Sequence, residues 1–310
     1  MATVAGFEDI RIVDNFYQTS AFFPMPVVAV ATLDERGETN IGPYSLCFPY
    51  YVAGKAYYGM LLEARNNSNT AENILRTGRC TLNFLPDVRR LMKECVELGF
   101  PGETTAEKMA HCSFSFVPGL RSQQDPEGLY PEIVQDAFQV FECEWDRELE
   151  NADRFSIQES YEPPYNNFNG ITSESGAHFI LKITNILLKP RYKEAILGGL
   201  KARLFPKVPV DYGYRDNTNF WFADFKLPYS AKIPRGKATA ATTVHYAANR
   251  IDPDITFTMD ACEKLVRVPR VFLNKALEQC VQWAKDNGVT TVLPEHMDQI
   301  RDKRAQEKAR

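Results

Sequence analysis

Short apolar runs separated by turns are the feature that most constrains how these 310 residues can fold. The stretch PVVAVATLDERGETNIGPYSLCFPY, which begins at Pro26, holds two such runs on either side of a polar turn around Gly37. This pattern is typical of a β-hairpin. The runs AYYGMLL (56–62) and RCTLNFL (79–85) predict further strands. Many short strands with few long helices favour a closed or partly closed barrel.

A short helix is predicted between the strands at 56–62 and 79–85. Asn69 is a suitable N-cap for it, and Glu72 completes the capping-box spacing three residues later. Gly78 supplies a stop, because glycine readily adopts the left-handed conformation in which many helices end. The sequence therefore predicts a helix of about two turns.

Two more helices are predicted after residue 86. Asp87 is a candidate N-cap for a segment whose apolar residues recur at helical spacing and which Gly99 ends. These apolar residues are Val88, Leu91, Met92, Cys95 and Val96. Thr104 and Glu107 repeat the capping-box spacing and predict the start of another short helix.

Later strands are predicted at AFQVFECEWDREL (137–149), HFILKITNILL (178–188) and NTNFWFADF (217–225). Between the first two lies an insert, residues 151–177, which is long, polar and rich in turn-forming residues. A loop of this length is unusual in a compact domain unless it covers a site or contributes to an interface. We therefore expect a lid or an interface arm.

The composition excludes several classes of function. Apolar residues make up 44% and charged residues 25% of the chain, as in ordinary globular proteins. The formal charge of −4 predicts no general attraction to nucleic acid or anionic lipid. No run approaches the roughly 18 apolar residues that a membrane span requires, and the N-terminus lacks a signal sequence. We expect a cytoplasmic protein with no nucleic-acid or membrane partner.

The seven cysteines indicate packing and not metal binding. They are odd in number, widely spaced and include no Cys-x-x-Cys pair, so we expect reduced thiols inside apolar runs and no metal site. These residues are Cys47, Cys80, Cys95, Cys112, Cys143, Cys262 and Cys280.

The character of the chain changes near Ile251, where helical signals replace strand signals. Helices are predicted from about Met259, from about Arg270 to Asp286 with a stop at Gly288, and from Pro294. Residues 236–255 have linker-like composition, although VHYAA within them is compatible with a helix. The predicted domains are a β-rich body (1–235), a linker (236–255) and a helical module (256–310).

The loop after the strand at 56–62 has the residue types that bind a phosphate monoester. Arg65 supplies a cation, and side-chain donors follow at once, with the start of a helix. The donors are Ser68, Asn69 and Thr70. The free N–H groups of a helix start attract anions. The alternative is that Asn69 only caps the helix and Arg65 is a solvated side chain.

Several motifs together resemble the flavin reductase-like, FMN-binding split-barrel family. The matching segments are Pro24 to Val28, Asn40 to Ser45, Tyr57 to Leu62, Thr70 to Ile74, Leu82-Asn83, AEKM (106–109), YPEIVQDAFQVFEC (130–143) and 178–188. The resemblance covers roughly residues 20–190. It implies a mainly β fold with some α structure, a split β-barrel of Greek-key type, and a homodimer whose interface contributes to the flavin site.

The same resemblance implies the positions of the FMN contacts. Those expected beside the ring and ribityl chain are Tyr44, Ser45 and Leu46. Those expected around the phosphate are Arg65, Asn66, Ser68, Asn69 and Thr70. Ser45 is alternatively a simple turn residue, and Tyr44 a simple core residue.

The family implies a flavin reductase-like oxidoreductase that transfers hydride from NADH or NADPH to flavin. His178 lies where the family often has a histidine after Gly-Asp, and it is the candidate contact for the nicotinamide. Here the motif is Gly-Ala-His, so a solvated residue at a strand end is the alternative. The main rival function is a non-catalytic FMN-carrying electron-transfer or docking protein. A third is oxidation of a small substrate, as in pyridoxamine phosphate oxidases.

The helical tail, about residues 257–301, resembles the small helical domain of light-independent protochlorophyllide reductase B-type subunits. The shared features are the Val268-Pro269 step, then Ala276, Cys280, Ala284 and Gly288. A unit this small is marginally stable alone, so we expect it to dock. Its own barrel and a partner protein or tetrapyrrole are the alternatives.

Overall fold

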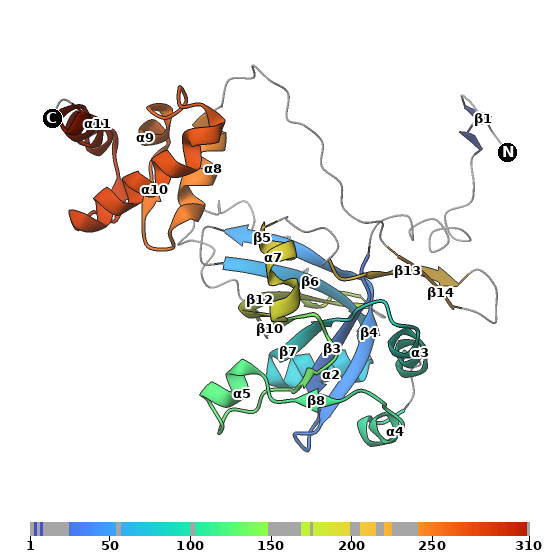
Figure 1. Cartoon of the computed structure of the whole chain (residues 1–310). Helices are drawn as coiled ribbons and strands as arrows, with labels where there is room; N and C mark the ends of the chain where they lie inside the picture. Colours follow the sequence, from blue (N-terminus) through green and yellow to red (C-terminus); the bar gives the residue numbers. More distant parts are fainter. Residues whose placement is uncertain are drawn as a thin grey trace. The chain divides into compact units, whose positions relative to one another are not determined.

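The computed structural model describes residues 3–4, 7–8, 25–53, 57–99, 103–147, 169–173, 176–198, 205–214, 220–224 and 241–308. The chain divides into two compact units, Met1–Tyr229 and Ser230–Arg310, and each is considered by itself (Figure 1).

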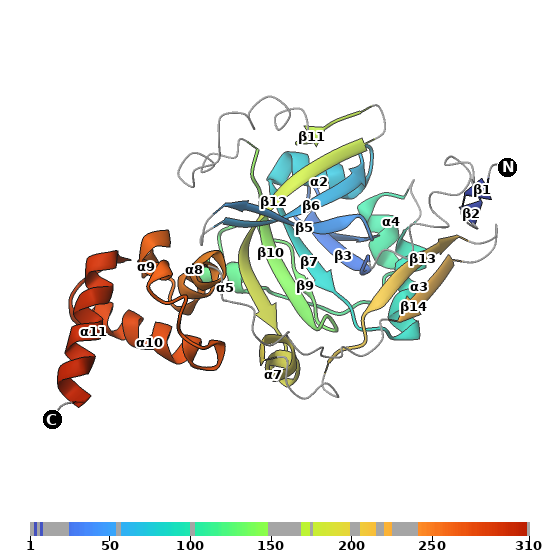
Figure 2. The same ribbon diagram turned by 90° about the horizontal axis from the view of Figure 1, so that it is seen from above.

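An antiparallel sheet forms the centre of the first unit. Its strands are β3 (Val28–Leu33), β4 (Thr39–Tyr44), β5 (Cys47–Ala53), β6 (Tyr57–Arg65), β7 (Arg79–Phe84), β10 (Gln139–Trp145) and β12 (Gly176–Leu188). The order across the sheet is β4-β3-β7-β10-β12-β6-β5, and β11 (Gly170–Ile171) pairs with β12. The sheet curls round a common interior (Figure 2).

The two edges of this sheet are joined by the chain itself. β4 and β5 lie at opposite ends of the strand order, yet only Ser45 and Leu46 separate them in sequence. The backbone N–H of Glu63 on β6 donates to the carbonyl of Leu46 at 2.9 Å. The chain therefore crosses from one sheet edge to the other at this point, as in a split barrel. The predicted mainly β split-barrel fold is confirmed.

The predicted hairpin forms between β3 and β4. The N–H of Asp34 donates to the carbonyl of Glu38 at 2.9 Å, and Gly37 has a φ of 78°, which glycine adopts without strain. The second apolar run, predicted as one strand, forms both β4 and β5. The strands predicted at 56–62, 79–85, 137–149 and 178–188 correspond to β6, β7, β10 and β12.

The late strand predicted at 217–225 is β14 (Phe220–Asp224). It pairs antiparallel with β13 (Pro209–Tyr214), which the sequence analysis missed. The short strands β1 (Thr3–Val4) and β2 (Phe7–Glu8) pair, as do β8 (Phe116–Val117) and β9 (Ile133–Val134).

The helices of this unit are α2 (Asn69–Thr77), α3 (Arg89–Leu98), α4 (Thr105–Ala110), α5 (Leu120–Gln124) and α7 (Pro190–Gly198). Asn69 is not the N-cap of α2. Ser68 is, because its hydroxyl accepts from the N–H of Ala71 at 3.2 Å. The stop at Gly78 is confirmed, with a φ of 68°.

The N-cap of α3 also differs from the prediction. Val88 and not Asp87 occupies that position, without a side-chain cap, and the N–H of Asp87 donates to the carbonyl of Lys207 at 2.8 Å. Gly99 ends this helix as predicted. The capping box of Thr104 and Glu107 at the start of α4 is present.

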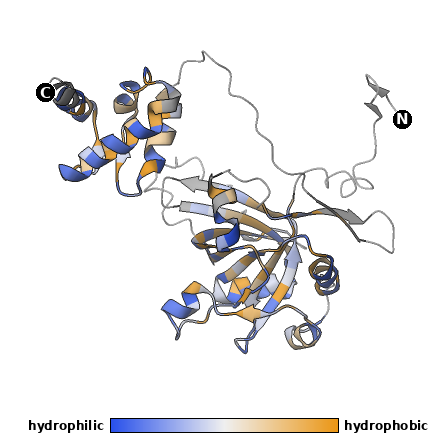
Figure 3. Ribbon diagram, in the orientation of Figure 1, coloured by the Kyte–Doolittle hydropathy of each residue, from blue (hydrophilic) through white to orange (hydrophobic). Residues whose placement is uncertain are grey.

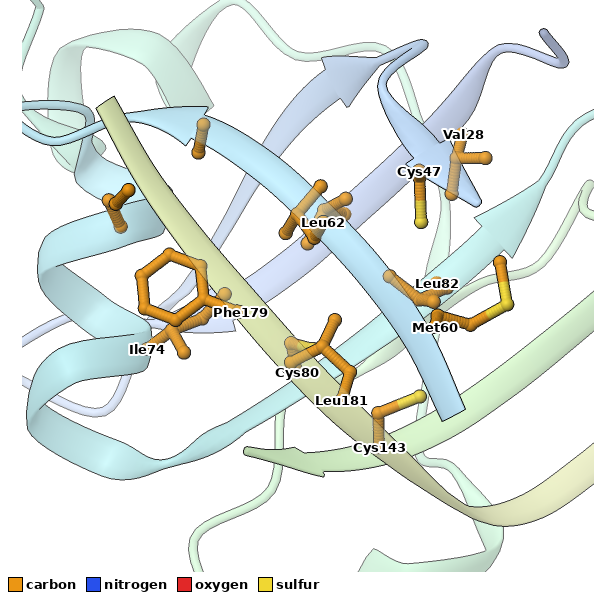
Figure 4. Packing of buried hydrophobic residues seen from close by; sticks show 14 of the residues in the cluster. Val28, Cys47, Met60, Leu62, Ile74, Cys80, Leu82, Cys143, Phe179 and Leu181 are labelled. Atoms are coloured by element: carbon orange, nitrogen blue, oxygen red, sulfur yellow. The ribbon is translucent and has the colours of Figure 1, made fainter. Parts of the chain in front are cut away.

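Two apolar clusters stabilise the barrel. The inner one fills the curl of the sheet, where Phe179 of β12 lies beside Ile74 of α2 (Figure 4). The other lies where α3 packs on the sheet and includes Leu91, Ile41 and Val140. All seven cysteines are free thiols, and all except the half-buried Cys112 are buried, so their predicted packing role is confirmed.

Most of the predicted insert lies outside the described residues. Its described part, 169–173 and 176–177, includes Asn169, whose side-chain oxygen accepts from the Trp145 indole at 2.7 Å and from the N–H of Ile180 at 3.1 Å. Its role as a lid or interface arm stays a prediction.

The second unit contains α8 (Ala241–Ile251), α9 (Met259–Glu263), α10 (Arg270–Asp286) and α11 (Pro294–Lys308), with β15 (Thr256–Phe257) parallel to β16 (Thr291–Val292). The three predicted helices are present. α8 lies inside the range predicted as linker, and its Val244 and Ala248 are fully buried in the core of this unit. Hydrophilic and hydrophobic residues alternate along α10 (Figure 3). Within the described residues, no helix is long and apolar enough to cross a membrane.

Candidate functional site

The first unit contains a cavity of about 520 Å³ beside the crossing from β4 to β5. It is lined by Gly42, Pro43, Tyr44, Ser45, Leu46, Glu63, Ala64, Arg65, Asn67, Ser68, Asn69, Thr70, Leu98, Gly99, Glu103, Lys108, Ser173 and Gly176. Its volume falls in the usual range for small-molecule sites. Seven of the eight predicted flavin contacts line it, and Asn66 does not.

The Ser68 hydroxyl closes the turn before α2. It donates to the carbonyl of Arg65 at 2.8 Å and accepts from the N–H of Ala71 and from the Tyr44 hydroxyl, the latter at 3.3 Å. A hydroxyl has one hydrogen to donate. In this arrangement Ser68 therefore has none left for an anion.

The predicted asparagine donors are also occupied within the chain. The Asn69 amide nitrogen donates to the carbonyl of Glu103 at 3.0 Å and is 3.4 Å from the side-chain oxygen of Asn40. The Asn66 amide donates to the carbonyl of Ser173 at 3.3 Å. Together with Ser68, these two asparagine side chains hold the loop in place.

The backbone at the start of α2 supplies the donors that remain. The N–H groups of Asn69 and Thr70 have no acceptor among the described residues, as expected for the first turn of a helix. They carry the partial positive charge of the helix dipole. This end of the cavity is suited to an anion.

Gly42 allows Tyr44 and Thr70 to approach each other. A Cβ on Gly42 would lie 3.1 Å from the Thr70 hydroxyl oxygen and 3.2 Å from the Tyr44 ring, so a larger residue would displace one of them. Burial raises the pKa of Tyr44, and its hydrogen bonds to Ser68 and Thr70 offset this only in part. Tyr44 is therefore a neutral hydrogen-bonding group at physiological pH.

Two cations line the cavity. Arg65 is exposed at the end of β6 and has no carboxylate partner among the described residues. Lys108 of α4 is half-buried. Burial lowers the pKa of Lys108, and the charges of Glu103 and Cys112 oppose that shift in part. Lys108 lies within the AEKM segment of the family resemblance, but no role was predicted for it. The only sequence signal near Lys108 was the capping box at Thr104, which predicts where α4 begins and so places Lys108 on that helix.

His178 lies next to the cavity but not in its wall. Its Nδ1 is 2.6 Å from the Thr172 hydroxyl oxygen, and its Nε2 is 3.8 Å from a carboxylate oxygen of Glu63. The side chain is 20% exposed, so it is not a freely solvated residue. Of its neighbours, Glu63 and Gly176 do line the cavity.

No group of three or more histidine, cysteine, aspartate or glutamate side chains is placed to hold a metal ion in the part of the chain that the structure describes.

Comparison with known proteins identifies the fold. No family model and no curated protein matches the sequence. The structure of 2-nitrobenzoate 2-nitroreductase from Pseudomonas fluorescens is similar, with a TM-score of 0.50 and 14% identity over 77% of this chain and 99% of that chain. The two chains share a fold.

Two further solved structures are similar at lower scores. Flavoredoxin from Methanosarcina acetivorans has a TM-score of 0.47 and 16% identity, over 74% of this chain and 98% of its own. An FMN-binding protein from Thermus thermophilus with bound p-hydroxybenzaldehyde has a TM-score of 0.47 and 12% identity, over 75% and 100%. The resemblance of residues 257–301 to a protochlorophyllide reductase subunit stays a prediction.

Proposed function

We propose that this chain binds FMN in the cavity beside the β4–β5 crossing and acts as a flavin reductase-like oxidoreductase with NADH or NADPH as donor. The observation that carries the proposal is that the first residues of α2, Asn69 and Thr70, line this cavity together with the cation Arg65, and that their N–H groups have no acceptor in the described part of the chain. The fold shared with a nitroreductase and the sequence resemblance to FMN-binding split barrels support it.

The phosphate of FMN fits at the start of α2. The N–H groups of Asn69 and Thr70 would donate to it, and the Arg65 guanidinium would pair with its charge. The side chains of Ser68, Asn69 and Asn66 act in this proposal by holding the loop, since their donors are already used. This refines the phosphate contacts expected from the sequence.

The rest of the cavity is suited to the ring. Tyr44, Ser45 and Leu46 line it beside the crossing, and Lys108 lines it from α4. When bound, FMN supplies a ring that accepts hydride at its own atoms. The task of the chain is then to position that ring and to stabilise the negative charge that arrives with the hydride. Lys108 is the half-buried cation available for that second role.

We propose a homodimer and a cytoplasmic location. β5 is an edge strand of the sheet and exposes Phe48, which is 38% accessible. An edge of this kind is a common site of association. Seven free thiols suit a reducing compartment. His178 remains the proposed neighbour of the nicotinamide, from its position next to the cavity.

The visible spectrum of the purified protein mixed with FMN tests the first step, and anaerobic addition of NADH or NADPH tests the second. Binding of FMN followed by rapid bleaching is the expected result. Yellow colour that persists with both NADH and NADPH would exclude a reductase and leave an FMN carrier. Failure to bind FMN would refute both.

A further inference from the structure

A network of polar side chains, three of them buried and one half-buried, connects the β3–β4 hairpin to α2. It consists of Thr32, Asn40, Asn69 and Asn73, and we call it the Asn40 network. Thr32 and Asn40 are fully buried and face each other as partners on β3 and β4. The Thr32 hydroxyl oxygen is 3.4 Å from the Asn40 amide nitrogen and 3.1 Å from that of Asn73.

The network runs along one face of α2. Asn69, Asn73 and Arg76 lie three or four residues apart, which places them on the same side of the helix. Asn69 contacts Asn40 at the first turn, and Arg76 donates to the Asn73 side-chain oxygen at 3.3 Å at the last turn. The opposite side of α2, with Ala71 and Ile74, packs in the inner apolar core.

A polar contact of this kind fixes the position of a helix more closely than an apolar one. Apolar packing is non-directional, so a helix resting on it has little resistance to small shifts along its axis. A buried amide left without a partner costs free energy, so the contact between Asn40 and Asn69 favours one position of the first turn of α2 on the hairpin. That position determines where the N–H groups of Asn69 and Thr70 point.

Asn40 is the member that joins the sheet to the start of the helix. It donates to Thr32 within the hairpin and accepts from Asn69, the first residue of α2. It does not line the cavity. Two residues along β4, Gly42 leaves the space in which Thr70 and Tyr44 meet. The strand β4 therefore contacts both of the first two residues of α2, Asn69 through Asn40 and Thr70 through Gly42.

We propose that Asn40 is a positioning residue for the phosphate end of the flavin site, acting through Asn69 on the first turn of α2. The inference rests on the proposed function, because it assigns that helix start to the phosphate of FMN. It predicts that Asn40 determines the preference for FMN over riboflavin, which has the same ring and no phosphate.

The test is to measure the dissociation constants of FMN and riboflavin for the full-length protein and for Asn40→Leu, which replaces the amide by an apolar group of similar size. We expect the FMN constant to rise about tenfold, as for the loss of one well-placed charge-assisted hydrogen bond. The riboflavin constant should change less than about twofold, because riboflavin makes no contact with the helix start.

Asn73→Leu is the matched control. Asn73 belongs to the same network and is similarly buried, but it contacts Thr32 one turn further along α2. It should lower stability without changing the preference for FMN. If Asn40→Leu does not fold, Asn40→Ser keeps a polar group that is too short to reach Asn69, and it should show the same selective loss.

Equal changes for FMN and riboflavin, or no change for FMN in a folded Asn40 variant, would overturn the inference. So would a selective loss of FMN in Asn73→Leu as large as that in Asn40→Leu. A wild-type protein that binds neither flavin, or binds both equally, refutes the proposed phosphate site itself. The two failures are therefore distinguishable.

Discussion

Arg65→Ala is the substitution that most directly tests the anion site. Arg65 lines the cavity at the end of β6, three residues before the N-cap of α2, and no carboxylate among the described residues neutralises it. Its removal takes away the full charge next to the proposed phosphate but leaves the N–H groups of Asn69 and Thr70 in place. The turn should persist, because the Arg65 atom that Ser68 contacts is a backbone carbonyl.

The expected loss follows from the exposure of the side chain. A hydrogen bond to a charged group contributes about 1.5 to 3 kcal/mol. Since Arg65 is exposed, solvent screens its charge, and we take the lower value of about 1.5 kcal/mol, which is roughly a tenfold rise in the FMN dissociation constant. Raising the salt concentration should weaken FMN binding to the wild type more than to the variant.

Fluorescence titration with FMN and riboflavin at two salt concentrations is the assay. Arg36→Ala is the matched control, because Arg36 is an exposed arginine in the hairpin turn and does not line the cavity. Riboflavin affinity should be unchanged in both variants. An FMN affinity in Arg65→Ala equal to that of the wild type, with the same salt dependence, would refute the assignment of the phosphate to this end of the cavity.

Three further predictions concern packing and pH. Gly42→Ala should destabilise the protein by about 1 to 3 kcal/mol and weaken FMN binding, because the new methyl group displaces Thr70 or Tyr44; unchanged urea unfolding would contradict this. Ile74→Ala should cost about 2 to 5 kcal/mol in urea unfolding, because Ile74 is fully buried between α2 and the sheet; a cost below about 1 kcal/mol would show that α2 does not pack there. Burial raises the pKa of Cys95 from 9.0 to about 12 and that of Cys262 to about 11. The contribution of these two neutral thiols to the free energy of unfolding should therefore be complete below about pH 9 and should fall as the pH rises towards these values. The free energy of unfolding of Cys95→Ala, measured with urea, should fall less between about pH 8 and 10.5 than that of the wild type. An equal fall in both proteins would contradict the assignment.

Local structure was predictable where a few neighbouring residues determine it. The hairpin turn at Gly37, the stop at Gly78 and the capping box at Thr104 depend on backbone conformations or hydrogen bonds within four residues, and all three are present. The N-caps at Asn69 and Asp87 were wrong. At α2 the neighbouring Ser68 is the cap, and the Asn69 amide donates instead to the carbonyl of Glu103, which is distant in sequence. At α3 the helix begins one residue later than predicted, with Val88 in the N-cap position.

In the candidate site, too, the features that depend on neighbouring residues were predictable, and those that depend on distant residues were not. The sequence by itself determined that an arginine, several donors and a helix start stand together in one loop, because they are adjacent in the chain. Only the tertiary structure decided which donors remain free, since Asn66 and Asn69 donate to Ser173 and Glu103, which are far away in sequence. It also brought Lys108 to the same cavity.

The strand order is the largest feature that only the tertiary structure decided. Sequence periodicity identifies a strand and its buried face, but it does not specify which strand pairs with which, because the backbone hydrogen bonds of all strands are alike. The site exists because β4 and β5, neighbours in sequence, form opposite edges of one curled sheet. The sequence determined the local elements and their chemistry, and the closure of the sheet determined the cavity that they surround.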